Sequence, residues 1–87
     1  MKIKDGFILR NVIDEYIVMP TGDNIGKYNG TVILNEVSAF VWNLLQQPSD
    51  YDAILQAILS EYEIDEATAR NDLDDLLAKF RAFEVLE

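Results

Sequence analysis

The sequence predicts an α+β fold, with a three-stranded antiparallel sheet followed by three helices. Runs of β-branched and aromatic residues bounded by turn-forming residues fill the chain up to residue 34. From residue 35 onward, apolar residues recur at the three- and four-residue spacing of helices. Strands that precede helices, instead of alternating with them, are typical of the α+β class. With 87 residues the chain can bury one modest core, so we expect a single domain over residues 1–87.

The first two strands are predicted to form a hairpin. Two β-prone runs, Phe7–Val12 and Glu15–Pro20, are separated by only two residues. Pro20 ends the second run because proline lacks the N–H that a sheet ladder needs. The polar segment over residues 21–27 contains glycines and a lysine, but it lacks the spacing and the Lys-Ser/Thr pair of a phosphate-binding loop. We therefore interpret it as a connector to the third strand.

The third strand and the central helix are predicted to follow each other without a linker. Asn29 and Gly30 favour positive φ and thus a tight turn, and residues 31–34 are mostly β-branched. Asn35 suits the N-cap, because its side-chain oxygen can accept from an unpaired N–H of the first helical turn. Apolar side chains lie on nearly all sides of the segment over residues 37–45, which predicts a helix inside the domain.

Two more helices are predicted to complete the fold. Ser49 and Asp52 have the spacing of a capping box just after the break at Pro48. The apolar residues that follow keep the rhythm of a helix with one buried face. Asp65 is the expected N-cap of a third helix that reaches about Phe83. Two helices joined by a tight turn beside a sheet resemble a winged helix-turn-helix.

The third helix carries an apolar core stripe with a mixed shoulder beside it. The stripe consists of Ala69, Leu73, Leu76, Leu77 and Phe80. At about 100° per residue, the shoulder consists of Arg70, Asp74, Leu77 and Arg81, with the small Ala67 and Ala78 just beyond it. Such a shoulder can border a binding groove. Alternatively, Glu66, Arg70 and Asp74, and separately Asp75 with Lys79, form ion pairs four residues apart on a solvated face.

The chain is strongly acidic and lacks two residue types that many catalytic and metal sites use. It has 16 acidic and 7 basic residues, and its net charge of −9 disfavours phosphate backbones and anionic lipid surfaces. Without histidine or cysteine it offers no imidazole base, thiol nucleophile, disulfide or conventional zinc site. We expect no nucleic-acid or membrane partner, no metal, no cofactor and no catalytic residue. The absence of an apolar signal core and of a membrane-length run predicts a cytoplasmic protein.

The region around the third strand and the central helix resembles the signature of a known family. The matching strings are NG at residues 29–30, LNEV at 34–37 and AFVWNLL at 39–45. They are similar to the PqqD-like family, named for a pyrroloquinoline quinone biosynthesis protein, and the order of elements agrees over nearly the whole chain. The family consists of peptide-recognition domains from pathways that make ribosomally synthesised, post-translationally modified peptides. The resemblance therefore implies a peptide-binding domain that is not an enzyme.

The resemblance also implies where the peptide binds. PqqD-like domains hold the leader segment of a precursor peptide between the third strand and the third helix. They present the remainder to a modifying enzyme such as a radical SAM protein, a protease or a cyclase. An exposed strand edge can accept such a peptide as a fourth strand, with specificity from pockets for alternate side chains. The expected peptide-binding residues are Thr31, Val32, Ile33 and Leu34 in the pairing strand, Leu77 and Ala78 as pocket residues, and Arg70, Asp74 and Arg81 as residues that fix the register against leader charges.

Two other classes of function are alternatives. A winged helix-turn-helix domain can bind DNA or regulate transcription through its third helix, although this helix carries four acidic residues against three basic ones. An enzyme or a magnesium site would have to use Asp72, Asp74 and Asp75. These residues point in different directions around a helix and have no histidine or cysteine to support them, so we interpret them as solvated acids.

Overall fold

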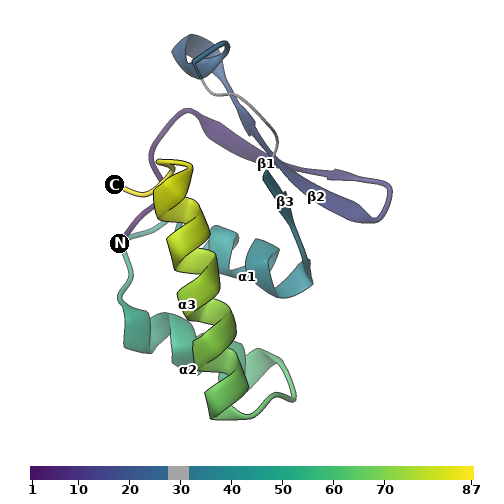
Figure 1. The fold of residues 1–87 in the computed structure, drawn as a ribbon, viewed down its shortest axis with the longest axis vertical. Coiled ribbons are helices and arrows are strands. Elements are labelled where there is room, and N and C mark those ends of the chain that lie inside the picture. Colours follow the sequence, from purple (N-terminus) through teal and green to yellow (C-terminus); the bar gives the residue numbers. More distant parts are fainter. Residues whose placement is uncertain (28–31) are drawn as a thin grey trace.

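The computed structural model describes residues 1–27 and 32–87, and its elements follow the predicted order (Figure 1). The strands are β1 (Phe7–Val12), β2 (Glu15–Pro20) and β3 (Val32–Leu34), with a short 3₁₀ turn at Gly22–Asn24. The helices are α1 (Glu36–Leu44), α2 (Tyr51–Glu61) and α3 (Glu66–Ala82). This three-stranded antiparallel sheet followed by three helices confirms the predicted α+β fold.

The sheet has the strand order β1-β2-β3, and both pairings are antiparallel. The hairpin has the predicted bounds, with Val12 paired to Glu15 across a two-residue turn. β3 pairs with β2 so that Ile33 lies opposite Ile17. The third strand was predicted to begin at Thr31; this residue and the predicted turn before it lie outside the described residues.

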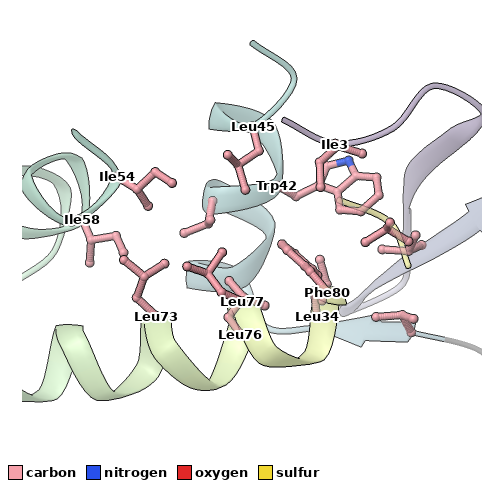
Figure 2. Packing of buried hydrophobic residues seen from close by; sticks show 14 of the residues in the cluster. Ile3, Leu34, Trp42, Leu45, Ile54, Ile58, Leu73, Leu76, Leu77 and Phe80 are labelled. Carbon is pink, nitrogen blue, oxygen red and sulfur yellow. The ribbon is translucent and has the colours of Figure 1, made fainter. Parts of the chain in front are cut away.

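The helices lie on one side of the sheet, with α2 farthest from it (Figure 1). α1 follows β3 directly, and Lys79 near the end of α3 reaches Ile33 of β3. Val32 and Leu34 of β3 are buried in the core, whereas Ile33 between them is 48% exposed on the opposite face. Trp42 of α1 meets Phe80 of α3 inside this core (Figure 2). The predicted α3 stripe is buried throughout: Ala69, Leu73, Leu76, Leu77 and Phe80. One hydrophobic cluster thus holds β3, α1 and α3 together.

Side chains at the predicted N-caps begin two of the helices. Asn35 accepts a hydrogen bond from the Ser38 N–H at 2.8 Å and begins α1. Asp65 accepts one from the Thr68 N–H at 2.7 Å and begins α3. Since Asn35 directly follows β3, the first turn of α1 fixes the end of that strand against the core.

The predicted start of α2 was wrong by one residue. Its N-cap is Asp50, whose carboxylate accepts from the Ala53 N–H at 2.8 Å, and not Ser49. The helix begins at Tyr51, so the residue whose oxygen can reach the third N–H of the helix is Asp50. The Ser49 N–H instead donates to the carbonyl oxygen of Met1.

The chain after α3 turns back sharply. Glu84 has a φ of 57°, the left-handed conformation common just after a helix, and the Val85 N–H donates to the Phe80 carbonyl oxygen at 3.1 Å. Leu86 then pairs with Ile3 in an isolated antiparallel bridge. The two ends of the chain therefore lie side by side (Figure 1).

Candidate functional site

β3 is an edge strand. β2 occupies one of its sides, and no strand within residues 1–27 and 32–87 pairs with the other side. An edge strand exposes N–H and C=O groups to which another extended chain can bond. The described part of the chain therefore has a free strand edge directly before the central helix, as predicted.

The register determines which backbone groups of β3 face this free side. In a hairpin with a two-residue turn, the flanking residues, here Val12 and Glu15, form a hydrogen-bonded pair. Hydrogen-bonded and non-bonded pairs alternate along an antiparallel ladder, so Ile17 directs its N–H and C=O toward β1. Its partner Ile33 then directs both groups away from β2. Ile33 thus presents one donor and one acceptor at the free edge, while its two neighbours in the strand bond to β2.

A groove lies between α1, the end of α2 and α3, and Asn35, which directly follows β3, is part of its lining. Its volume is about 300 Å³. Buried apolar side chains, including Val41 and Leu73, line it together with polar side chains that are exposed or half-buried. The polar side chains come from the start of α1 and from one flank of α3: Asn35, Ser38, Asp72, Asp75 and Lys79. The groove therefore combines an apolar wall with one ammonium group and two carboxylates.

Lys79 links this groove to the strand edge. Its Nζ donates to the carbonyl oxygen of Ile33 at 3.4 Å, and the same side chain lines the groove. This contact agrees with the register, which directs that carbonyl away from β2. The alternative prediction of an ion pair between Lys79 and Asp75 was wrong: in the described part of the chain, Lys79 forms no ion pair.

The predicted strand residues differ in what they expose. Val32 and Leu34 are 7% and 3% exposed, so their side chains belong to the core. The side chain of Ile33 lies on the face of the sheet away from the helices. Thr31 lies outside the described residues. At the free edge, β3 therefore offers the backbone of Ile33 and not a row of side chains.

Arg70 and Asp74 lie on the flank of α3 that faces α2, away from β3. Arg70 Nε donates to the Glu66 carboxylate at 3.2 Å, as the ion-pair alternative predicted, and Arg70 Cζ lies 5.9 Å from the ring centroid of Tyr51. Asp74 accepts a hydrogen bond from the Tyr51 hydroxyl at 2.7 Å. Glu66 raises the pKa of Arg70, and the hydrogen bond to Asp74 raises the pKa of Tyr51. These side chains thus stabilise the α2–α3 contact.

The other predicted α3 residues also lie away from the groove beside β3. Arg81 lines a second hollow near the chain ends, together with Lys4 and Glu84. Leu77 is 2% exposed and points toward α1 in the core (Figure 2). Ala78 is exposed on the surface of α3. None of the five predicted α3 residues lines the groove, and their contact with a peptide stays a prediction.

The groove is lined by the shoulder of α3 that lies across the core stripe from the predicted one. Asp72, Asp75 and Lys79 lie there, and at about 100° per residue the buried stripe separates them from Arg70 and Asp74. Hydrophobic periodicity identifies the stripe but not which of its two shoulders lies beside the sheet. Steps of three and four residues between Asp72, Asp75 and Lys79 were the available signal. This spacing shows that the three side chains share one face of the helix, but it does not show that this face lies beside the sheet.

The described residues hold neither a metal-binding cluster nor a helix that spans a membrane. Among them, no group of three or more Asp and Glu side chains could hold a metal ion. No helix in the same residues has the length and apolar character to cross a membrane. A free backbone edge beside a partly apolar groove is suited to an extended polypeptide, whose main chain bonds to the strand and whose side chains enter the groove.

Comparison with known proteins identifies relatives of this fold and site. Residues 15–86 match the family model described as coenzyme PQQ synthesis protein D (PqqD). A solved structure, "TbiB1 in Complex with the TbiA(beta) Leader Peptide", is 29% identical with a TM-score of 0.76, over 100% of this chain and 95% of that chain. Comparison with curated protein sequences gave no match. Because the family match runs from the start of β2 to the bridge at the chain ends, the chain belongs to the PqqD family.

Proposed function

We propose that this protein binds the leader segment of a ribosomally made precursor peptide, which adds to β3 as a fourth strand beside α3. The orientation of Ile33 is the observation that carries this proposal, because its N–H and C=O face the free side of the sheet. An added strand gains two main-chain hydrogen bonds there. Alternate side chains of the same strand point toward α3 and its groove.

The relatives support a leader peptide as the ligand. The chain belongs to the PqqD family, and the similar TbiB1 was solved with the TbiA(beta) leader peptide bound. We further propose that the bound precursor is presented to a modifying enzyme, such as a radical SAM protein, a protease or a cyclase. Such an adaptor needs no catalytic group of its own. It acts by holding the rest of the precursor near the enzyme and so raising its effective concentration.

No observation favours the alternative of DNA binding. On α3, the helix that would enter a groove of DNA, Glu66, Asp72, Asp74 and Asp75 outnumber the three basic residues. The net charge of the chain is −9. A surface that binds phosphates needs clustered Lys and Arg side chains, because the phosphate contacts supply most of the affinity.

A titration followed by backbone amide shifts tests the proposal. The ¹⁵N-labelled protein is mixed with the TbiA(beta) leader peptide and, separately, with the leader of any precursor encoded beside its own gene. A scrambled peptide of the same composition is the control for charge and hydrophobicity. We expect saturable shifts at Ile33, Asn35 and Lys79, because these residues border the strand edge and the groove.

The location of the shifts decides the outcome. Saturable shifts confined to α2 and the β1-β2 turn, with Ile33 unchanged, would contradict strand addition to β3. Equal shifts with the scrambled peptide would show that the protein does not recognise a leader sequence.

A further inference from the structure

Lys79 occupies the acceptor that an added strand needs. Its Nζ donates to the Ile33 carbonyl oxygen at 3.4 Å, and this oxygen is the one that the register directs to the free side of β3. A peptide N–H that approaches the same oxygen competes with the ammonium group. Lysine side chains at sheet edges are known to protect them against unspecific strand pairing. Lys79 thus caps the edge in the free protein, and we expect a peptide N–H that bonds along the strand to displace this long, exposed contact.

We propose that Lys79 is a specificity-determining residue. When a peptide N–H replaces it at the Ile33 carbonyl oxygen, Lys79 favours peptides that carry a carboxylate next to that N–H. This inference rests on the proposed function, because it requires the peptide to add to β3. After displacement, the ammonium group is still tethered to α3 on the groove side of the strand. The bound peptide removes part of its water. A partly desolvated ammonium group is stabilised by a hydrogen-bonded anion and destabilised by another cation.

The pleat of the sheet identifies the peptide positions concerned. We take the peptide to add antiparallel to β3, as the other strands of the sheet pair. In an antiparallel hydrogen-bonded pair, the two side chains lie on the same face of the sheet. Since the side chain of Ile33 lies on the outer face, the peptide residue paired with it also points outward. The two residues that flank it in the peptide point to the inner side, toward α3 and Lys79. The carboxylate is therefore expected at one of these two flanking positions.

The carboxylates already in the groove leave Lys79 available. Asp75 and Asp72 lie on the same shoulder of α3, but neither forms an ion pair with Lys79 in the described residues. Once displaced, Lys79 can pair with Asp75 one helical turn away, and this competition limits the size of the peptide preference. An exposed pair between Lys79 and Asp75 is weak. A peptide carboxylate that the bound backbone holds close to Lys79 should therefore pair with it in preference to Asp75.

The test compares peptides of different charge on matched protein variants. In the TbiA(beta) leader peptide and in the leader of a precursor encoded beside the gene, each residue is replaced in turn by Glu, Gln and Lys. Dissociation constants are measured for the wild type, Lys79→Met and Lys4→Met. Methionine keeps the length of the side chain without its charge. Lys4→Met changes the net charge equally, but in the hollow at the chain ends.

We expect the charge preference to depend on Lys79 alone. At a flanking position, Glu peptides should bind the wild type and Lys4→Met about five to ten times more tightly than Lys peptides. Lys79→Met should bind both to within about twofold, with Gln peptides as the neutral reference. Thermal melting confirms that the variants are folded, and Lys79→Gln replaces Lys79→Met if the added methionine causes association.

The amide signal of Ile33 separates this inference from the proposed function. If Lys79→Met still binds Glu peptides more tightly than Lys peptides, or if the wild type shows no such preference, the proposed role of Lys79 is wrong. Strand addition to β3 is not affected by either result. Binding that leaves the Ile33 amide unshifted, or no binding by either leader, overturns both.

Discussion

The indole of Trp42 meets the ring of Phe80 edge to face, with 5.7 Å between the centroids and an interplanar angle of 77°. Trp42 belongs to α1, which β3 enters directly, and Phe80 follows Lys79 on α3. This contact therefore joins the helix that follows β3 to the helix that borders the groove. Two core residues that do not line the groove thus help to position the two elements beside it.

Phe80→Ala should destabilise the protein and weaken peptide binding together. Phe80 is fully buried, and truncation of a buried phenylalanine to alanine costs about 3–5 kcal/mol in the free energy of unfolding. Chemical denaturation measures this loss. Phe83→Ala is the matched control, because Phe83 is only partly buried and should cost less. Equal losses for the two variants would contradict the central role of the Trp42–Phe80 contact.

Glu84→Gly should stabilise the protein. Glu84 adopts a φ of 57°, a conformation that glycine reaches without the steric cost of a Cβ atom, and its side chain is exposed. We expect the free energy of unfolding to rise by about 0.5–1 kcal/mol, as for other glycines placed just after a helix. Thermal or chemical unfolding measures the gain. Glu84→Ala controls for the loss of the carboxylate, and a gain of the same size in this variant would exclude the backbone explanation.

The strands and helices were predictable because local chemistry specifies them. The hairpin followed from two β-prone runs on either side of a two-residue turn, and α1 and α3 begin directly after the residues whose side chains suit an N-cap, Asn35 and Asp65. The cap of α2 was misplaced because Ser49 and Asp50 both suit an N-cap, and the capping-box spacing favoured the wrong one. The choice between adjacent candidates depends on tertiary contacts, here the bond between Ser49 and the N-terminal residue.

The candidate site was only half predictable. The free edge of the third strand followed from the order of the elements, since the last strand before the helices has no later strand to cover it. Which shoulder of α3 lies beside that edge could not be predicted, because the pattern of buried residues is the same seen from either side of the stripe. Lys79 and Asp72 flank the groove, whereas the charges chosen from the sequence, Arg70 and Asp74, pack beside α2. Only the direction in which α3 crosses α1 distinguishes these two shoulders.

Because Asp65 caps α3, part of the free energy of unfolding should depend on pH in the acidic range. The hydrogen bond from the Thr68 N–H lowers the pKa of Asp65 below its ordinary value of 3.8. Because the folded state favours the ionised form, this contribution is present above pH 3.8 and is lost as the pH falls through the lowered pKa.

Asp65→Asn isolates this contribution. Asparagine caps a helix about as well as aspartate but does not titrate. The difference in the free energy of unfolding between wild type and variant should be constant from pH 7 to about 5 and should shrink below pH 3.8. Denaturation curves across this range measure it, and Asp65→Ser, a second cap that does not titrate, should give the same difference curve. A difference that grows at low pH would show that the sign of the linkage is wrong.

Proline at Ile33 should weaken peptide binding, whereas proline at Val32 should destabilise the fold. The reason is that the register directs the two N–H groups to opposite sides of β3. In Ile33→Pro the lost donor faces the free edge, where proline is tolerated, so the fold should persist while leader binding weakens at least about tenfold. In Val32→Pro the lost donor bonds to β2, and we expect a loss of about 1–3 kcal/mol in the free energy of unfolding.

Denaturation and peptide binding are measured on both variants, with Ile33→Ala as the control that shortens the side chain and keeps the N–H. Binding by Ile33→Ala should stay within about threefold of wild type, because the Ile33 side chain lies on the outer face of the sheet while its backbone faces the added strand. The reverse pattern, in which Ile33→Pro unfolds the protein and Val32→Pro leaves it stable, would mean that the Ile33 N–H bonds to β2. The free edge would then present different backbone groups, and neither strand addition at Ile33 nor the cap by Lys79 could hold.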